Sequence, residues 1–578
     1  MTPIIQIENL HYRPPSTSVN EPEILCGIDL NVESGTFVAI VGENGSGKTT
    51  LLKHLNGLLT PSEGSIVIDG LDTRRNEHRV RLQSRVGMVF QNPAEQIVAS
   101  TVAEDVAFGL ENLNLPSNEI QNRVTEQLTA AGILSEANRP PHLLSGGQIQ
   151  RAALAGVLAR DPRIILLDEP TSMLDSNARS SFLQHLYQLK QDGKTIIYIT
   201  HHMEETLAAD LVVIMKSGQV VISGSPQKVF NEKINLYEYG LEKPELIYLA
   251  EGFRSFGWQI PDLVLGPGTL SEAIPVYAKH HLVSTRYTHK NKLENAQTII
   301  DVKELQFTYL PDSAFAKKAL KNVDLVVTTG SIHGIAGSNG SGKSTLLQHI
   351  NGIFRPESGS ARVGRFSLED SQTRLRDIIQ FVGLVFQNPE DQFFEVFVGD
   401  EIAYGPKQFL MDDVRDRVRE SMHLVGLDFK LFKDRRIETL SGGEKRKVAL
   451  ASTLVLNQNI LLFDEPTAGM DPKARNEILN LFKTLQNEGK TIVFASHKLE
   501  EMANIATHLS LMHAGMVTKT GQFNHVVTDI NAIKNSLLKP PLAVSLALAL
   551  IEKGWPIDIN NSYTASRLLS SIKDCLNA

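Results

Sequence analysis

Cysteine and tryptophan are scarce in this sequence, with two of each among 578 residues. The cysteines, Cys26 and Cys575, lie far apart and form no CxxC pair, so neither a disulfide framework nor a zinc site is predicted. Positive charge is not in excess either, because the formal net charge is −8. A broad cationic surface for nucleic acid is therefore disfavoured, and any small anion must be captured locally.

A long apolar run is also missing. The most apolar stretch, Leu542 to Ile551, is closed by Glu552 and Lys553 and is shorter than the roughly 20 residues of a membrane-spanning helix. It is predicted to form one face of a buried helix. Hydrophobic residues make up 42% and charged residues 21% of the chain, which is typical of a folded globular protein. A single core rarely grows to this length, so at least two domains are expected.

The sequence is an internal duplication. The string GENGSGKTTLLKHLNG, from Gly42, recurs as GSNGSGKSTLLQHING from Gly337, and later motifs repeat at a nearly constant offset. KPELIYLAEGFRSFGW near the end of the first half is echoed by KPPLAVSLALALIEKGW in the second, which indicates a small appendage after each domain. Glycines, prolines and mixed polar residues predict a connector from Gly266 to Gln297. The expected division is domain one at 1–240, appendage and linker at 241–297, domain two at 298–530 and a C-terminal appendage at 531–578.

Each half contains a glycine loop of the phosphate-binding type. GENGSGKT and GSNGSGKS match the pattern in which backbone N–H groups surround a phosphate chain at the start of a helix. The Lys48 and Lys343 ammonium groups are expected to reach the β- and γ-phosphates, and the Thr49 and Ser344 hydroxyls to bind Mg²⁺. The sequence thus predicts two sites for ATP with Mg²⁺, whose loop residues are Gly42, Glu43, Asn44, Gly45, Ser46, Gly47, Lys48, Thr49 and Thr50, and Gly337, Ser338, Asn339, Gly340, Ser341, Gly342, Lys343, Ser344 and Thr345.

The residues around both loops predict an α/β fold. The apolar runs FVAIVG and IHGIAG, which lead into the loops, are typical of buried strands. Apolar residues at helical spacing follow each loop and predict helices that extend to Leu59 and Phe354. The positions concerned are Leu51, Leu52, Leu55, Leu58 and Leu59 in the first half, and Leu346, Leu347, Ile350, Ile353 and Phe354 in the second.

Two further apolar runs, RIILLDEP and NILLFDEP, end in a pair of acids. Asp168 and Asp464 are placed to hold Mg²⁺, directly or through water. Glu169 and Glu465 are candidates for the general base that polarises the attacking water. An acidic pair after a strand is by itself more often a solvated loop, but a phosphate loop in the same half favours the catalytic interpretation.

LSGGQ from Leu144 and LSGGE from Leu440 precede these acids at the same distance in both halves. A Ser-Gly-Gly sequence at the start of a helix offers a hydroxyl and free amides, which form a second anion site. Together with the phosphate loops, these strings resemble the ATP-binding-cassette (ABC) family over nearly the whole chain. The resemblance implies two P-loop cassettes, each with a RecA-like parallel-sheet core, an antiparallel β subdomain and an α-helical signature subdomain.

The resemblance also implies roles for further residues. In this family the signature of one cassette completes the ATP site of the other, which pairs Lys48 with the second signature and Lys343 with the first. The signature residues concerned are Ser145, Gly146 and Gly147, and Ser441, Gly442 and Gly443. Glu444 departs from the commoner glutamine, a change that functional family members also carry.

Three more pairs of residues match family positions. Gln91 and Gln387 correspond to a glutamine that contacts Mg²⁺ and the attacking water, and His201 and His497 to a histidine that contacts the γ-phosphate and orients the catalytic glutamate. Tyr12 and Tyr309 correspond to the aromatic residue that stacks on adenine. A core tyrosine is the open alternative for this last pair.

The strings QNPAEQ and QNPEDQ around the two glutamines resemble energy-coupling-factor (ECF) importers. The resemblance implies a peripheral ATP hydrolase at the cytoplasmic face of the cell membrane, coupled to a transmembrane coupling subunit and a small substrate-binding membrane subunit. The cargo would be a vitamin or precursor, with thiamine or hydroxymethylpyrimidine the nearest match, or a transition-metal ion. A ribose-type sugar importer ATPase and a soluble ribosome-associated tandem cassette protein are the alternatives. Glycines and prolines after Gly266 replace the charged helical arm that the ribosomal class requires.

Overall fold

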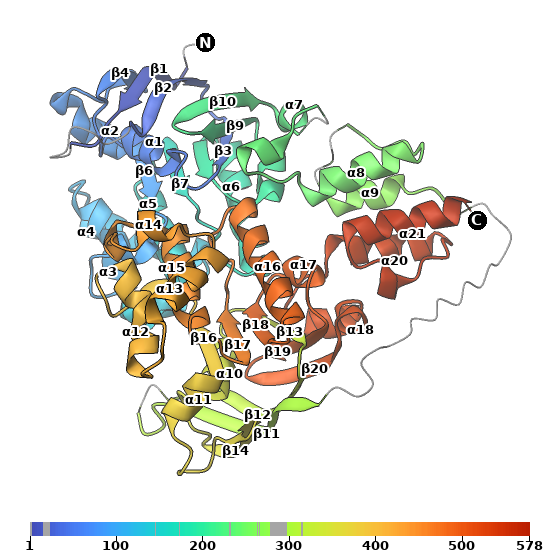
Figure 1. Ribbon diagram of the computed structural model, residues 1–578. Coiled ribbons are helices and arrows are strands. Elements are labelled where there is room, and N and C mark those ends of the chain that lie inside the picture. Colours follow the sequence, from blue (N-terminus) through green and yellow to red (C-terminus); the bar gives the residue numbers. More distant parts are fainter. Residues whose placement is uncertain are drawn as a thin grey trace. The chain divides into compact units, whose positions relative to one another are not determined.

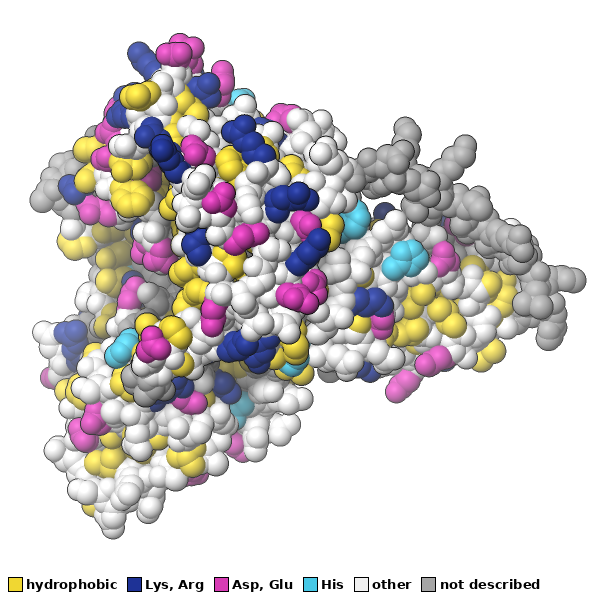
Figure 2. All heavy atoms as spheres, turned by 90° about the horizontal axis from the view of Figure 1, so that it is seen from below, with side chains coloured by type: hydrophobic (Ala, Val, Ile, Leu, Met, Phe, Trp, Pro, Cys, Tyr) yellow, Lys and Arg dark blue, Asp and Glu magenta, His cyan; other side chains and the backbone are white. Residues whose placement is uncertain are grey.

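The computed structural model describes residues 3–15, 23–144, 146–172, 174–230, 233–262, 264, 266–277, 297–313 and 316–577. The chain divides into two compact units, 1–247 with 469–473, and 248–468 with 474–578. Each unit contains an α/β cassette with two sheets (Figure 1). On the face shown in Figure 2, acidic and basic side chains are interspersed, in keeping with the absence of a cationic excess.

A six-stranded sheet forms the centre of the first cassette. Its order is β10-β9-β3-β8-β7-β6, and every described pairing in it is parallel except that of β9 with β10. The strands β3 and β7 are buried along their whole length, as the two apolar runs predict. The strands are β3 (Phe37–Gly42), β6 (Val86–Val89), β7 (Ile164–Asp168), β8 (Thr195–Ile199), β9 (Leu211–Lys216) and β10 (Gln219–Gly224).

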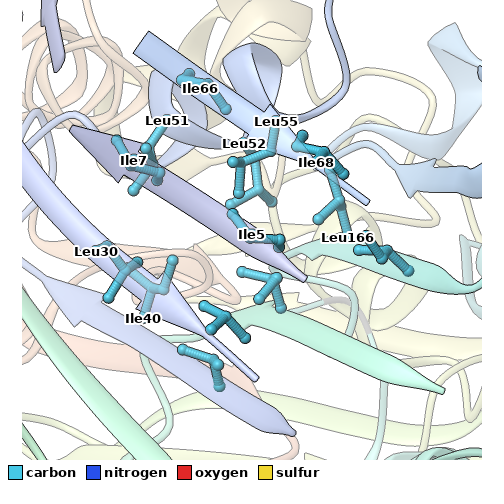
Figure 3. Close-up of a cluster of buried hydrophobic side chains, with 14 of the residues drawn as sticks. Ile5, Ile7, Leu30, Ile40, Leu51, Leu52, Leu55, Ile66, Ile68 and Leu166 are labelled. Atoms are coloured by element: carbon cyan, nitrogen blue, oxygen red, sulfur yellow. The ribbon is translucent and has the colours of Figure 1, made fainter. Parts of the chain in front are cut away.

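A four-stranded antiparallel sheet of order β2-β1-β4-β5 covers the phosphate-loop helix. Isoleucines from β1 and β4 and leucines from the helix α1 (Lys48–Leu55) meet in one cluster with residues of the central sheet (Figure 3). Burying one such side chain contributes about 1.5–3 kcal/mol, so this cluster fixes the helix against both sheets. The strands are β1 (Ile5–Tyr12), β2 (Leu25–Val32), β4 (Glu63–Ile68) and β5 (Leu71–Asp72).

The helices of the first cassette include a separate helical subdomain, in which α3, α4 and α5 share a buried cluster. A capping box between Thr101 and Glu104 fixes the start of α3. The helices are α1 (Lys48–Leu55), α2 (Arg79–Arg85), α3 (Val102–Glu111), α4 (Ser117–Ala130), α5 (Gly146–Ala159), α6 (Ser176–Gln191) and α7 (Pro226–Val229).

The second cassette repeats this plan with an antiparallel sheet of order β12-β11-β14-β15 and a central sheet of order β16-β17-β18-β13-β19-β20. Its first described strand begins at Thr298. The strands are β11 (Thr298–Tyr309), β12 (Lys317–Thr328), β13 (Ile332–Gly337), β14 (Ser358–Val363), β15 (Phe366–Ser367), β16 (Val382–Val385), β17 (Ile460–Asp464), β18 (Thr491–Ser496), β19 (His508–His513) and β20 (Met516–Gln522).

The second cassette's helices follow the same order as those of the first. They are α10 (Lys343–Ile350), α11 (Leu375–Phe381), α12 (Val398–Gln408), α13 (Val414–Leu424), α14 (Phe429–Phe432), α15 (Gly442–Leu454), α16 (Pro472–Asn487), α17 (Leu499–Ala503), α18 (Phe523–Val527) and α19 (Ile530–Asn535).

The helices after the two phosphate loops are shorter than predicted. α1 ends at Leu55 and α10 at Ile350, because Gly57 and Gly352 follow with φ values of 70° and 83°. Leu58 and Ile353, which were expected on the buried face, are 44% and 40% exposed. The helical spacing of apolar residues therefore did not predict helix or burial beyond the glycine in the left-handed conformation that ends each helix.

The two appendages pack together as one helical layer in the second unit. They consist of α8 (Glu245–Ser255), α9 (Pro267–Ala273), α20 (Leu542–Glu552) and α21 (Ala565–Asn577). The Trp258 and Trp555 rings lie 5.1 Å apart, and the Trp555 indole N–H donates to the Pro275 carbonyl at 2.8 Å. The predicted connector thus begins with a packed helix, α9, and residues 278–296 lie outside the described part. This packing explains why residues 248–277 group with the second cassette.

The apolar stretch near the C-terminus forms α20, as predicted, and its residues Ala543, Val544, Leu546, Ala547 and Leu550 are buried. Within the described residues, every helix is too short or too polar to span a bilayer.

A stacked histidine pair with one fully buried member distinguishes the second cassette and makes it sensitive to acid. The His333 ring on β13 is fully buried, stacks on His508 and contacts the Ser510 hydroxyl at 2.8 Å. Burial lowers the pKa of His333 to about 3. Below pH 6.5 the unfolded chain therefore binds a proton that the folded cassette does not, and stability falls as the pH falls.

We expect acidification from about pH 6.5 to 5 to lower the free energy of unfolding by about 2 kcal/mol through this group. The variant His333→Val, which copies Val38 at the matched position of β3, should lose that part of the pH dependence. Urea midpoints of both proteins at pH 7.5 and 5 measure the effect. Equal pH dependence of the two proteins would show that His333 does not cause it.

Candidate functional site

The conformation of the first phosphate loop depends on hydrogen bonds from its lysine and on a glycine with a positive φ. The Lys48 ammonium donates to the carbonyls of Gly42 and Glu43 at 2.9 and 2.8 Å. Gly47, before α1, has a φ of 97°, and a Cβ there would come within 2.8 Å of Leu25 Cδ2. Burial lowers the pKa of Lys48. The loop therefore presents a buried cation at the N-terminus of α1, where a phosphate is best stabilised.

The second phosphate loop has the same geometry. Lys343 donates to the carbonyls of Gly337 and Ser338 at 2.9 and 3.1 Å. Gly342 precedes α10 with a φ of 105°, and its Cβ would lie 2.9 Å from the Ala319 carbonyl oxygen. The Lys343 ammonium also lies 3.8 Å from the Glu465 carboxylate. Both copies of the predicted loop thus fold alike.

The acidic pair of the first cassette stands at the end of β7, facing the phosphate loop. The Glu169 carboxylate lies 2.8 Å from His201 Nε2, and both side chains are buried. Burial acts to raise the pKa of Glu169, but His201 and Lys48 outweigh it and hold that pKa below its usual range. Glu169 is therefore a carboxylate at neutral pH and able to accept a proton from water.

The same arrangement recurs at the end of β17. His497 Nδ1 lies 3.1 and 3.2 Å from the two Glu465 carboxylate oxygens. Burial opposes ionisation of Glu465, but His497 and Lys343 keep its pKa below the usual range. The structure therefore brings together each predicted lysine, glutamate and histidine within its own cassette.

The two strand-end aspartates are suited to a divalent cation. Burial raises the pKa of Asp168 to about 6, and the Thr49 hydroxyl lies beside this carboxyl group. Both Asp168 oxygens are buried without a hydrogen-bond partner among the described residues. In the second cassette burial likewise raises the pKa of Asp464, which lies beside the Ser344 hydroxyl. A hydroxyl next to an unpaired carboxylate is the donor set that Mg²⁺ bound to phosphates uses, so the residues fit the predicted ion.

The second signature sequence caps a helix. The Ser441 hydroxyl accepts from the Glu444 N–H at 3.3 Å, and the Glu444 carboxylate accepts from the Ser441 N–H at 2.8 Å. The glutamate in LSGGE thus completes a capping box at the start of α15. Gly146 and Gly147 begin α5 in the first cassette, whereas Ser145 lies outside the described residues.

The two glutamines follow the strands β6 and β16, and both side chains are exposed. Gln91 lies close enough to Glu169 to help lower the pKa of that carboxyl group. The Gln387 carbonyl accepts from the Arg446 guanidinium at 2.9 Å. The first glutamine therefore reaches the predicted catalytic centre through its side chain, and the second is anchored through its backbone.

The two tyrosines differ. Tyr12 is 8% exposed and belongs to the core cluster, with its ring edge-on to His54 at 4.6 Å. This arrangement matches the alternative of a core tyrosine. Tyr309 is half-buried, and its hydroxyl lies 3.1 Å from the Thr345 hydroxyl in the second phosphate loop. Adenine stacking stays a prediction for both, and Tyr309 is the better placed.

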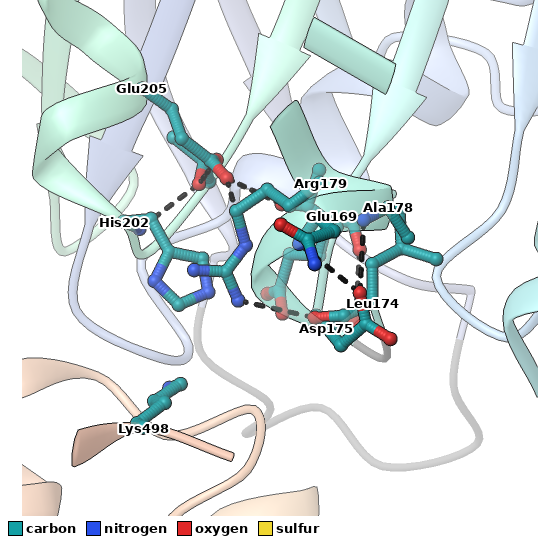
Figure 4. A network of polar contacts seen from close by, with 12 residues as sticks. Glu169, Leu174, Asp175, Ala178, Arg179, His202, Glu205 and Lys498 are labelled. Carbon is teal, nitrogen blue, oxygen red and sulfur yellow. Dashed lines mark hydrogen bonds and ion pairs between the residues drawn. The ribbon is translucent and has the colours of Figure 1, made fainter. Parts of the chain in front are cut away.

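A buried glutamate behind each histidine is a feature that the sequence analysis missed. Glu205 accepts hydrogen bonds from the hydroxyls of Thr171, Tyr198 and Thr200 at 2.8, 2.6 and 2.5 Å. Its carboxylate also lies 3.5 Å from the Arg179 guanidinium (Figure 4). It therefore ties the segment after Glu169 to the end of β8, just before His201. The signal was the repeated Glu-Glu pair, whose second glutamate stands four residues after each histidine.

The second cassette builds this support differently. Glu501 accepts from the Thr467 hydroxyl at 2.5 Å and pairs with Lys498 at 3.2 Å. Burial raises the pKa of Glu205, whereas Lys498 and Arg475 outweigh burial and lower the pKa of Glu501. The two sites thus share their central residues but differ in the electrostatics of the supporting layer.

Comparisons with known proteins agree with this geometry. The model of the family described as ABC transporter matches residues 25–172 and 320–468, about half of the chain. A Methanosarcina acetivorans protein described as an ABC transporter ATP-binding protein is 32% identical over 94% of this chain and 88% of its own length. The energy-coupling factor transporter ATP-binding protein EcfA1 of Symbiobacterium thermophilum is 48% identical over 43% of this chain and 88% of its own.

Among solved structures, CbiO1 of Clostridium perfringens, described as part of the ABC transporter complex CbiONQ, is 32% identical over 41% of this chain and 94% of its own, with a TM-score of 0.37. The match over nearly the full length of a relative and the two copies of the family model lead to one conclusion. The chain belongs to the ABC transporter family, as an ATP-binding subunit with two ATP-hydrolysing cassettes.

Proposed function

We propose that this chain is the ATPase of an ECF-type importer and acts at the cytoplasmic face of the membrane. The observation that carries the proposal is the 48% identity of one half to EcfA1, an energy-coupling factor ATP-binding protein. The paired QNPAEQ and QNPEDQ loops support it in both halves. The cargo would be a vitamin, a precursor such as hydroxymethylpyrimidine, thiamine itself, or a transition-metal ion. One chain would supply both cassettes of the functional pair.

The proposed roles follow from the geometry of each cassette. Lys48 and Lys343 bind the β- and γ-phosphates, and Glu169 and Glu465 accept the proton of the attacking water. His201 and His497 hold these carboxylates in place and keep them ionised. Gln91 and Gln387 report the γ-phosphate to the helical subdomain. The residues that would hold Mg²⁺ are Thr49, Asp168 and Gln91 in one cassette and Ser344, Asp464 and Gln387 in the other. The ion would neutralise charge on the phosphate oxygens.

The segments QNPAEQ from Gln91 and QNPEDQ from Gln387 are called the glutamine loops. Each cassette exposes two apolar side chains in the residues that follow its glutamine loop. Phe394 is 75% exposed and stacks on Tyr404 at 5.4 Å, and the matched residues Val98 and Phe108 are 68% and 50% exposed. The neighbouring Phe393 is half-buried and is not part of this pair. We propose that these two pairs, which we call the docking pairs, receive apolar helices of the coupling subunit.

One acid of each helical subdomain, the buried Glu401 and the half-buried Asp105, holds the backbone of its docking pair. The Glu401 carboxylate accepts from the N–H groups of Phe394 and Glu395, both at 2.8 Å. Asp105 does the same for Val98 and Ala99 at 2.9 and 3.3 Å. A movement of the subdomain would therefore carry its docking pair with it.

Copurification from native membranes tests the proposed class of importer. We expect the tagged full-length chain to retain a small transmembrane coupling subunit after mild detergent extraction, identified by mass spectrometry. Recovery of a large sugar permease would instead support the ribose-type alternative. Ribosomal proteins in stoichiometric amounts would support the soluble alternative and contradict the importer.

A further inference from the structure

Arg446 joins three parts of the second cassette. It lies on the signature helix α15, and its guanidinium donates to the Glu465 carbonyl at 2.7 Å and to the Gln387 carbonyl at 2.9 Å. One acceptor belongs to the residue after β17 and the other to the residue that begins the glutamine loop after β16. A planar guanidinium can hold two such acceptors in a fixed geometry, which a lysine cannot.

The first acceptor, the Glu465 carbonyl, belongs to the proposed catalytic residue, whose backbone conformation is unusual. Glu465 has a φ of 47°, a left-handed conformation that a residue with a side chain rarely adopts. A charge-assisted hydrogen bond to its carbonyl stabilises that conformation and therefore the direction of the carboxylate. Burial lowers the pKa of Arg446 to about 10, so the guanidinium stays charged at neutral pH.

Among the described residues of the first cassette, this connection is absent. Gln150 occupies the matched position on α5, is fully buried, and forms no hydrogen bond through either side-chain atom to the described residues. The Ser172 hydroxyl instead donates to the Glu169 carbonyl at 3.0 Å, and Ala468 stands at the matched position of the second cassette. Each glutamate carbonyl thus has a side-chain donor, but only Arg446 also holds the glutamine loop.

The glutamine loop of the second cassette is attached to α15 at a second point. The Gln392 side-chain amide donates to the Ala449 carbonyl at 3.1 Å and to the hydroxyls of Ser452 and Thr453 at 3.1 and 3.2 Å. In the first cassette the matched Gln96 turns inward and accepts from the Phe90 N–H at 3.2 Å. These contacts therefore hold the signature helix and the glutamine loop together in the second cassette, and the described part of the first cassette does not repeat them.

We propose that Arg446 is a positioning residue that couples the glutamine loop to Glu465, so that the two ATP sites differ in how closely hydrolysis follows the position of the helical subdomain. The proposal rests on the catalytic role proposed for Glu465. In the second cassette, a shift of α15 moves the glutamine loop and the backbone of Glu465 together. In the first, Ser172 holds Glu169 independently of α5, and its turnover depends less on the subdomain.

The exchange Arg446→Gln with Ala468→Ser tests the coupling, because it converts the second cassette to the arrangement of the first. The serine restores a donor for the Glu465 carbonyl, but the link to Gln387 stays broken. We expect Arg446→Gln alone and the double variant both to lower the kcat of ATP hydrolysis by the full-length chain at least about twofold, with an unchanged KM for ATP. Gln150→Leu, at the matched but unbonded position, is the control and should keep the wild-type kcat.

Two outcomes would overturn the coupling: a wild-type kcat for Arg446→Gln, or full recovery of kcat on adding Ala468→Ser. If Arg446→Gln fails to fold, Arg446→Lys replaces it in the test. Lysine keeps the positive charge but lacks the planar guanidinium that binds two acceptors at once. The kcat of this variant must then fall by the same factor. The variant Glu465→Gln distinguishes the coupling role proposed for Arg446 from the catalytic role proposed for Glu465. If Glu465→Gln retains turnover, the role of Glu465 is wrong, whereas loss of turnover there with a normal Arg446→Gln contradicts only the coupling.

Discussion

Replacing Glu169 and Glu465 together by glutamine should lower steady-state ATP hydrolysis at least about 100-fold, the contribution expected of a general base. Each carboxylate lies against a histidine, 2.8 Å from His201 Nε2 and 3.1 Å from His497 Nδ1, and is ionised in spite of its burial. Glutamine keeps the size of the side chain and removes the proton acceptor. The phosphate loops are untouched, so ATP binding should persist, and phosphate release and binding of a fluorescent ATP analogue measure the two quantities.

The exposed Glu8 on β1 supplies the matched control, because Glu8→Gln makes the same chemical change at a residue that belongs to neither predicted ATP site. It should hydrolyse ATP at the wild-type rate. A double variant that loses nucleotide binding together with turnover would indicate a structural role for the two glutamates. Near wild-type turnover would require another base.

The phosphate loops, strand-end acids and histidines could be predicted because each lies in a short string with its own local geometry. A glycine with positive φ before a helix and an acid at the end of a buried strand depend on neighbours in sequence, as Gly47 and Asp168 show. The α/β class and the two cassettes followed from the same strings. Helix length did not follow as well, because Gly57 and Gly352 end helices whose apolar spacing continues.

Contacts between distant segments could not be predicted in this way. Arg446 finds its acceptors in two separate loops, and nothing in the string LSGGEKRK indicates which carbonyls they are. The buried Glu205 and Glu501 have the same local sequence pattern, yet one is bonded to the Tyr198 phenol and the other to Lys498. Duplication preserved the central residues, and the supporting side chains diverged in ways that only the packed structure displays.

Alanine at both Phe394 and Val98 should separate ATP hydrolysis from attachment to the membrane partner. Both side chains are largely exposed, so their loss costs little packing, and thermal stability and the turnover of the isolated chain should match the wild type. If the docking pairs receive the coupling subunit, removing two apolar anchors should lower its copurification from membranes at least about tenfold. Quantitative mass spectrometry of the extracted complex gives this ratio.

Leu410→Ala and Val80→Ala are the matched controls, because these side chains are 87% and 77% exposed and belong to neither docking pair. Together they remove a similar apolar area and should leave the complex intact. The acids beneath the docking pairs sharpen the test, since Glu401→Gln keeps Phe394 in the chain but weakens the two backbone hydrogen bonds that hold it. Partial loss of the coupling subunit in that variant would show that orientation matters as well as apolar area. Full copurification after Phe394→Ala with Val98→Ala would place the contact with the membrane subunit on another surface.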